Sequence, residues 1–353
     1  MADEIKWFDY RGRSDAKFQF FVGGRGIGKS YSGLDEIYQH GMRTDGVSKY
    51  MYFRMSEIEL KSSCGHGNAF GDYNLEKGVD VELEYSDKLS EIWVYDPYKS
   101  KDIEYKSTLI GYAKSLETFS NLRSVSFADV DYIMFDEFIP EPAARRKPIH
   151  KMAGKVFKNA YETINRNREL KGRPPVKCYF FGNSNTVDSD ILREFGLLDV
   201  LSNMIRKQIY RYNDRKQSIY LEICQAPDVS ERKRNTALYT LTAGDKDFMR
   251  MAIDNEFPTE EFMLISERPK NEYNPVVQFA DYSIWKHKSN NMWYICKSNS
   301  TAKVRYDSTD ELLFYRNYNV DYVCRLLEKK VQFDSASTKA EMQRILGRNL
   351  RNK

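Results

Sequence analysis

Short apolar runs recur along the first two hundred residues of this chain. Strands of a parallel sheet that is covered on both faces are apolar at nearly every position. Runs of this kind lie at 18–22, 50–54, 131–135 and 177–181. A helix is expected from about Lys29 to His40, and another from Lys155 to Leu170, where apolar side chains recur at helical spacing until Gly172. Strands that alternate with helices predict an α/β domain built on a parallel sheet.

Two other parts of the chain have a different periodicity. Between Gly78 and Lys114 apolar and polar positions alternate, which predicts antiparallel strands inserted in the α/β core. After residue 235 the pattern is β-rich and predicts a second domain of the α+β class. Its strands are expected at 261–266, 275–285 and 292–296, and its helices at 309–317, 320–329 and 337–353.

Length and composition exclude several classes of protein. A chain of 353 residues, 41% of them hydrophobic, predicts two packed domains and excludes a disordered protein. No apolar run approaches the ~20 residues of a membrane span, and no signal peptide is expected. Five scattered cysteines without a C-x-x-C pair fit a reducing compartment. Cys64-Gly65-His66 has no second pair of ligands nearby, so we interpret it as a loop and not a metal site.

Basic residues gather between positions 204 and 234. The net charge of the whole chain is only +4, so any nucleic-acid contact must be local. This segment contains eight Lys and Arg residues and four acidic residues, with tyrosines between them. Two interpretations are open: a lid or linker that touches a polyanion, or a solvated linker. The expected divisions are an α/β domain over 1–203, a basic linker or lid over 204–235, and a C-terminal domain over 236–353.

Directly after the first apolar run, the chain contains a complete G-x-x-x-x-G-K-S phosphate-binding loop that opens a predicted helix. In such a loop the backbone N–H groups and the helix N-terminus bind phosphates. Lys29 is expected to reach the β- and γ-phosphates of ATP, and Ser30 to hold Mg²⁺. The expected nucleotide-binding residues are Gly23, Gly24, Arg25, Gly26, Ile27, Gly28, Lys29, Ser30 and Tyr31.

The apolar run at 131–135 ends in Asp136-Glu137, at the edge where open α/β sheets bind ligands. Asp136 is expected to hold Mg²⁺ and Glu137 to polarise the attacking water. GTPases have Asp-x-x-Gly at this place, and protein kinases need His-Arg-Asp and Asp-Phe-Gly; this chain has none of these. The pair indicates an ATPase with a catalytic glutamate. Asn183, after the fourth run, either orients the water or simply ends a strand.

Three stretches resemble the DNA-packaging ATPases, or DNA encapsidation proteins, of small tailed bacteriophages, which are terminase-like P-loop motors. They are residues 23–31, Phe135 to Ile139, and Arg166-Asn167-Arg168-Glu169, in the family's order. Arg25 inside the phosphate loop is typical of viral packaging motors. The resemblance covers the first two hundred residues, while the C-terminal part matches only in size and β-rich character.

The resemblance implies an ATPase ring, a pentamer by preference, that pumps double-stranded DNA through a portal into a procapsid. It implies ATP and Mg²⁺ as cofactors and a site of action in the host cytoplasm, with transient attachment to the procapsid. It further implies a degenerate ribonuclease-H-like C-terminal domain that docks the ring, commonly on a packaging RNA.

Two other functions remain open. One is a P-loop conformational switch or helicase-loader that does not translocate DNA, and the other is a terminase with an active nuclease domain. A nuclease needs a cluster of carboxylates. Asp281 stands alone on the candidate strand Val276–Ile284, so nuclease activity is not expected, although Asp307, Asp310 and Glu311 keep that alternative open.

Catalysis in a ring is expected to use an arginine from a neighbouring subunit, which neutralises charge on the γ-phosphoryl group. Arg166 is the first candidate because it points away from the apolar stripe of its predicted helix, and Arg123 is the second. Arg168 continues the stripe and is expected to anchor locally. For both candidates the alternative is a surface arginine in a salt bridge.

A packaging motor must hold DNA of any sequence, so we expect contacts to phosphates and not to bases. The alternative for each candidate is an ordinary solvated charge. The candidate DNA-binding residues are Lys61, Arg145, Arg146, Lys147, Arg206, Arg211 and Arg215.

Overall fold

The computed structural model describes residues 5–65, 69–96, 106–122, 125–141, 147–184, 186–242, 244–245, 249, 257, 264–267 and 270–347. It divides into two compact units. The first contains Met1–Phe195 and Met204–Phe257, and the second contains Gly196–Asn203 and Pro258–Lys353. Among the residues described, no helix combines the length and apolar character that crossing a bilayer requires.

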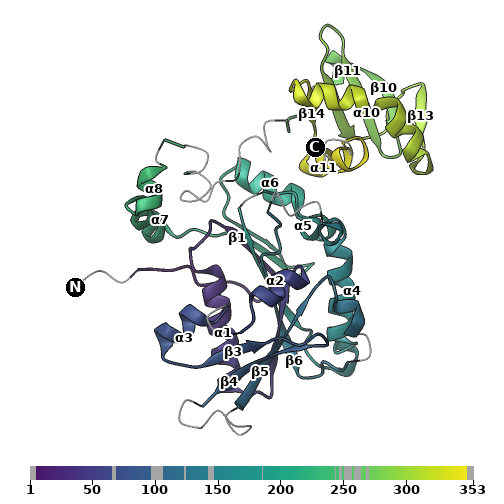
Figure 1. Ribbon diagram of the computed structural model, residues 1–353. Helices are drawn as coiled ribbons and strands as arrows, with labels where there is room; N and C mark the ends of the chain where they lie inside the picture. The colour runs from purple at the N-terminus through teal and green to yellow at the C-terminus, as the bar shows by residue number, and fades with distance from the viewer. Residues whose placement is uncertain are drawn as a thin grey trace. The chain divides into compact units, whose positions relative to one another are not determined.

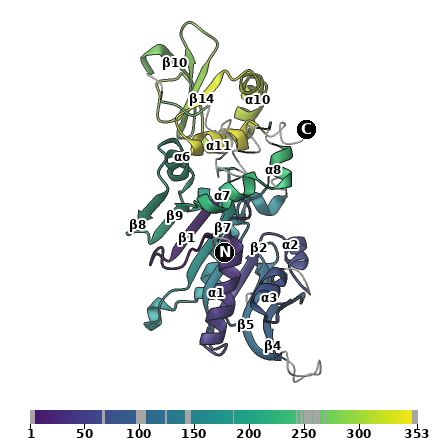
Figure 2. The same cartoon turned by 90° about the vertical axis from the view of Figure 1, so that its left-hand side faces the viewer.

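The first unit is built on a sheet of nine strands, in the order β3-β4-β5-β2-β6-β7-β1-β9-β8. The six strands from β5 to β9 in this order are parallel, and the two ends of the sheet are completed by antiparallel pairs. Figure 2 shows β8, β9 and β1 at one end of the sheet and β4 and β5 at the other. The strands are β1 (Phe18–Gly23), β2 (Lys49–Arg54), β3 (Val81–Glu84), β4 (Ser90–Tyr95), β5 (Lys106–Ser115), β6 (Val130–Asp136), β7 (Lys177–Asn183), β8 (Arg211–Asp214) and β9 (Ile219–Ile223).

Helices cover both faces of this sheet, with α1 on one side and α4 on the other (Figure 1). Alternate residues of each strand therefore pack in opposite directions. On β7, for example, Phe180 meets Phe157 of α4 with ring centroids 4.9 Å apart, whereas a Cβ on Gly33 of α1 would lie 3.0 Å from Phe181. The helices of the unit are α1 (Lys29–Arg43), α2 (Glu57–Ser62), α3 (Gly71–Lys77), α4 (Ala153–Asn165), α5 (Asp190–Glu194), α7 (Pro227–Arg234) and α8 (Ala237–Leu241).

The four predicted apolar strands are confirmed as β1, β2, β6 and β7, and the parallel α/β class with them. The alternating segment after Gly78 does form antiparallel pairs, β3 with β4 and β4 with β5. Its last strand, β5, also runs parallel beside β2. The insertion therefore extends the main sheet.

The prediction of a linker or lid over 204–235 is wrong for its central part. Residues Ile219–Ile223 form β9, which is buried throughout and lies in the large sheet between β1 and the edge strand β8. The surplus of basic residues comes from exposed positions around this strand, so composition alone concealed a core element.

The helix predicted to end at Leu170 ends at Asn165. Arg166 and Asn167 both adopt left-handed backbone conformations, with φ of 39° and 59°, which breaks the helical hydrogen-bond ladder. Arg166 therefore lies at the C-cap of α4 and not on a helix face, so the orientation predicted for it on that helix is wrong. Arg168 is buried and donates to Asp131 Oδ1 at 2.6 Å, which confirms its local anchoring role.

The second unit has a five-stranded mixed sheet in the order β13-β10-β11-β12-β14, so its β-rich α+β character is confirmed. Its predicted strand at 275–285 is in fact a hairpin, β10 and β11, with Ala280 and Asp281 in the turn. The two predicted helices at 309–329 are one continuous helix, α10. The elements are β10 (Tyr273–Phe279), β11 (Tyr282–His287), β12 (Trp293–Lys297), β13 (Val304–Tyr306), α10 (Glu311–Leu327), β14 (Val331–Phe333) and α11 (Ala336–Ile345).

Residues 198–203, the first part of α6 (Leu198–Arg206), group with this second unit. Within it the backbone N–H of Ser337 donates to Asp199 Oδ1 at 3.0 Å. The boundary expected at residue 203 therefore does not match the packing, because the residues just before it belong to the second unit and those after it to the first.

Candidate nucleotide-binding site

The phosphate loop connects the end of β1 to the start of α1, as its sequence predicts. Gly28 is the N-cap residue of α1 and has a φ of 105°, a backbone conformation that residues with a side chain rarely adopt. A Cβ on this residue would also lie 3.2 Å from the carbonyl oxygen of Phe8. Glycine is needed here both for the backbone turn and for the close approach of the N-terminal segment.

Lys29 is buried at the centre of the loop. Its Nζ donates to the carbonyl oxygens of Gly23 at 3.0 Å and Gly24 at 2.6 Å, and lies 3.4 Å from Asn183 Oδ1. Burial lowers the pKa of Lys29 to about 8. The ammonium is thus held at the anion-binding end of the loop, where phosphate oxygens would compete with the carbonyls for it.

Ser30 and Asp136 meet at the edge of the sheet. The Ser30 hydroxyl donates to Asp136 Oδ1 at 2.8 Å, so the two predicted Mg²⁺ ligands lie side by side. Burial raises the pKa of Asp136, and the neighbouring Arg54 guanidinium opposes that rise. Hydroxyl and carboxylate oxygens are the donors that Mg²⁺ prefers, so the pair fits this ion.

Arg54 is a site residue that the sequence interpretation missed. It ends β2 next to the end of β6, and its guanidinium contacts both acidic residues, Asp136 Oδ2 at 3.1 Å and Glu137 Oε2 at 2.6 Å. Its side chain is 11% exposed. The sequence feature that could have predicted it is a charged residue at the end of an apolar strand, the feature that also predicted Asp136.

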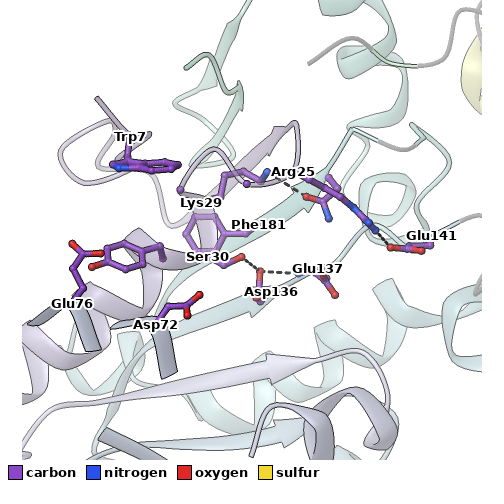
Figure 3. Close-up of a pocket in the computed structure, with 14 residues that line it drawn as sticks. Trp7, Arg25, Lys29, Ser30, Asp72, Glu76, Asp136, Glu137, Glu141 and Phe181 are labelled. Atoms are coloured by element: carbon purple, nitrogen blue, oxygen red, sulfur yellow. Dashed lines mark hydrogen bonds and ion pairs between the residues drawn. The ribbon is translucent and has the colours of Figure 1, made fainter. Parts of the chain in front are cut away.

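Glu137 follows β6 in a left-handed conformation with φ of 54°. Its backbone N–H donates to Asp136 Oδ1 at 3.1 Å, while its half-exposed carboxylate is held by Arg54. Figure 3 shows Lys29, Ser30, Asp136 and Glu137 converging on the same place. The carboxylate that should polarise water is therefore engaged by a cation in this structure.

Lys29, Ser30, Asp136 and Glu137 line a cavity of about 750 Å³, in the size range of small-molecule sites. Arg25 forms an ion pair with Glu141, another residue of the lining (Figure 3). Trp7, which is 54% exposed, lies at the opposite end of the cavity from that pair. The lining residues are Trp7, Arg25, Gly26, Gly28, Lys29, Ser30, Tyr31, Asp72, Glu76, Asp136, Glu137, Glu141, Phe181 and Asn183.

The other predicted site residues lie in different surroundings. Ile27 is buried beneath the loop, and Arg166 is exposed and does not line the cavity. An exposed position away from the cavity is compatible with a role at a neighbouring subunit. Arg123, Arg145 and Arg146 lie outside the described residues.

The candidate DNA-binding residues are spread over the first unit. Lys61 is exposed on α2, the helix that follows β2, with its ammonium 4.8 Å from the Tyr85 ring. Arg211 lies 3.6 Å from Glu222, while Arg215 is exposed in the turn between β8 and β9. Because β9 runs parallel to β1, that turn lies at the opposite edge of the sheet from the phosphate loop. Lys147 is partly buried, and Arg206 is exposed at the end of α6.

Comparison with known proteins gives relatives over nearly the whole chain. The DNA packaging protein of Bacillus phage B103 is 26% identical over 328 residues, which cover 89% of each chain. That of Bacillus phage phi29 is 25% identical over 322 residues, covering 89% of this chain and 86% of the relative.

A chain in the solved structure of the phi29 viral genome packaging motor assembly has the same fold. It superposes with a TM-score of 0.60 at 22% identity, over 94% of this chain and 96% of that one. The model of the podovirus DNA encapsidation protein (Gp16) family matches residues 12–339. This chain therefore belongs to the podovirus DNA encapsidation protein family.

Proposed function

We propose that this chain is the ATP-hydrolysing subunit of a ring-shaped motor that drives double-stranded DNA into a viral procapsid. The observation that carries the proposal is the convergence of Lys29, Ser30, Asp136 and Glu137 around one cavity, in a member of this family. The relatives from phages B103 and phi29 are DNA packaging proteins, which supports the same substrate for this chain.

In the proposed reaction Lys29 neutralises the β- and γ-phosphates, and Ser30 with Asp136 would hold Mg²⁺, which would offset the negative charge of the phosphates. Glu137 orients and polarises the attacking water. The Arg54 guanidinium binds Glu137 Oε2 at 2.6 Å, so Oε1 is the oxygen that would accept a proton unless Arg54 moves away. Asn183, near Lys29 at the end of β7, is placed to contact the γ-phosphate or the water.

We further propose that an arginine of a neighbouring subunit completes the site, with Arg166 as the first candidate and Arg123 as the second. An arginine finger raises the rate of hydrolysis by a factor of ~10³–10⁵, so its loss should be easily measured. Mixing Arg166→Ala subunits with Lys29→Ala subunits tests this arrangement. Recovered ATPase activity at mixed interfaces is expected, and no recovery at any ratio would exclude Arg166.

We propose that the second unit attaches the ring to the portal. The resemblance to the family further suggests that the ring is a pentamer and that this unit binds a packaging RNA. Asp281, the acidic residue that stood out on its candidate strand, is exposed in the β10–β11 turn. We therefore propose that this unit, with its ribonuclease-H-like resemblance, docks the motor and does not cut DNA.

The decisive experiment is ATP hydrolysis by the full chain, alone and with purified procapsids and linear duplex DNA. We expect DNA and procapsids together to stimulate hydrolysis and to protect the DNA inside the capsid. Lys29→Ala is the inactive control. Hydrolysis that neither DNA nor procapsids change would favour the conformational switch or helicase-loader, and metal-dependent cutting of plasmid DNA would favour the nuclease-active terminase.

A further inference from the structure

A lysine from the C-terminal side of the first unit touches the phosphate loop. Lys233, on α7, donates a hydrogen bond from its Nζ to the carbonyl oxygen of Arg25. A Cβ on Gly26 would lie 3.1 Å from that nitrogen and 3.6 Å from Lys233 Cε. The same ammonium lies 6.0 Å from the ring centroid of Tyr239 on α8. Lys233 therefore connects the loop to the two helices that follow β9.

The geometry of the peptide unit gives this contact a consequence. The peptide bond between Arg25 and Gly26 is trans and planar, so its C=O and its N–H point in opposite directions. Lys233 holds the carbonyl, while Gly26 lines the cavity and Lys233 does not. The Gly26 N–H therefore points away from the Lys233 ammonium.

The loop needs such a constraint because this peptide is easy to rotate. Gly26 has φ of 63° and no side chain to prevent a peptide flip. The Arg25 side chain is anchored separately by its ion pair with Glu141. A cation on the carbonyl also polarises the amide and makes its N–H a stronger donor.

Lys233 adds to the positive charge at the loop as well. Burial lowers the pKa of Lys29 most, and the attraction of acidic neighbours is partly offset by the like charge of Lys233.

We propose that Lys233 is a positioning residue, which fixes the Arg25–Gly26 peptide with its N–H toward the nucleotide phosphates and transmits the state of the loop to α7. The inference rests on the proposed ATP-binding function. When phosphates bind the Gly26 N–H, the charge on the Arg25 carbonyl increases and its bond to Lys233 strengthens. Nucleotide binding therefore stabilises α7, the helix from which the chain continues toward the second unit.

The test compares Lys233→Met, Lys233→Gln and Lys233→Arg with the matched control Lys171→Met, at an exposed lysine remote from the cavity lining. Calorimetry measures ATP affinity in the presence of Mg²⁺, and amide hydrogen exchange over 227–241 measures the response of α7 and α8. We expect Lys233→Met to weaken ATP binding about tenfold, as for the loss of one charge-assisted hydrogen bond. Lys233→Arg should keep most of the affinity, and Lys233→Gln should fall between.

The effect of ATP on hydrogen exchange in α7 is the measurement that would not change if Lys233 only stabilised the fold. In the wild type and in Lys171→Met, saturating ATP should slow exchange in α7; in Lys233→Met the same saturation should not. Affinity within twofold of wild type in Lys233→Met, or a preserved α7 response, would overturn the inference. If Lys233→Met does not fold, Lys233→Gln carries the same comparison. Failure of the wild type itself to bind ATP would instead refute the proposed function.

Discussion

Replacing Arg54 with methionine tests how the acidic residues of the site are stabilised. Methionine keeps most of the length and apolar volume of arginine but removes its charge. Arg54 and Asp136 are 11% and 8% exposed, so the substitution leaves a buried carboxylate without its nearest cation. Breaking a buried pair in this way costs about 3–5 kcal/mol. The half-exposed Glu137 partner adds only about 0–1 kcal/mol.

We expect a loss of about 3 kcal/mol in the free energy of unfolding, near the lower end of that range, because Ser30 still donates to Asp136 and Lys29 remains nearby. Urea denaturation of the nucleotide-free chain measures this loss. Repeating it with Mg²⁺ and a non-hydrolysable ATP analogue should restore most of the stability, since a new cation then faces Asp136. The control is Arg43→Met, an exposed arginine 2.8 Å from Glu36, which keeps Arg11 at 3.8 Å; the expected change is below about 0.5 kcal/mol.

The pH dependence gives a second check with a definite sign. The folded-state pKa of Asp136 is already raised above 3.8, and removing Arg54 raises it further. A carboxyl group of this kind favours the folded state most when it is protonated, and that contribution is lost as pH rises through its folded pKa. The difference between wild type and Arg54→Met should therefore shrink as pH falls toward 3.8. A loss that is independent of both pH and nucleotide, or no loss at all, would refute the electrostatic reasoning.

Four further predictions concern the other site residues. Because the pKa of Lys29 is lowered to about 8, ATP affinity measured by calorimetry should decrease as pH rises above 8, and a flat profile to pH 9 would contradict this. Glu137→Gln should bind ATP with near wild-type affinity but lose hydrolysis in a single-turnover assay; near wild-type turnover would disprove its role. Arg168→Met should lower the unfolding free energy by about 1.5–3 kcal/mol in urea titrations, because buried Arg168 loses its hydrogen bonds to Asp131 and to the carbonyl oxygen of Ala128 while Ser48 still donates to Asp131. Arg166→Ala should change it by less than about 0.5 kcal/mol. Lys61→Ala should make the log–log salt dependence of duplex DNA binding shallower by about one unit, without sequence preference; an unchanged slope would remove Lys61 from the DNA contact.

The parts of the fold that could be read from the sequence are those specified by local patterns. The four apolar runs became β1, β2, β6 and β7 because a strand buried on both faces must be apolar at almost every position. The phosphate loop could be recognised for a similar reason, since its glycines are needed for backbone conformations that are set within a stretch of eight residues. Gly28, with φ of 105°, is one of them.

The errors occurred where local composition and tertiary packing disagree. Residues 219–223 lie in a basic segment, yet they form a fully buried strand beside β1. The helices predicted at 309–317 and 320–329 are one helix, because α10 continues without a break between the two ranges and buries Asn319. In both places contacts with distant residues outweigh the local signal, which propensity alone cannot reveal.

The sequence by itself determined the residues on which the proposed chemistry depends: a phosphate loop, and a strand that ends in Asp136-Glu137. Only the tertiary structure decided which distant side chains contact those residues. Arg54 reaches both acidic residues because parallel pairing sets the ends of β2 and β6 side by side, and Lys233 reaches a loop 208 positions earlier because β9 pairs with β1. Such contacts depend on strand order, which is fixed by the packing of the whole sheet and leaves no short motif in the chain.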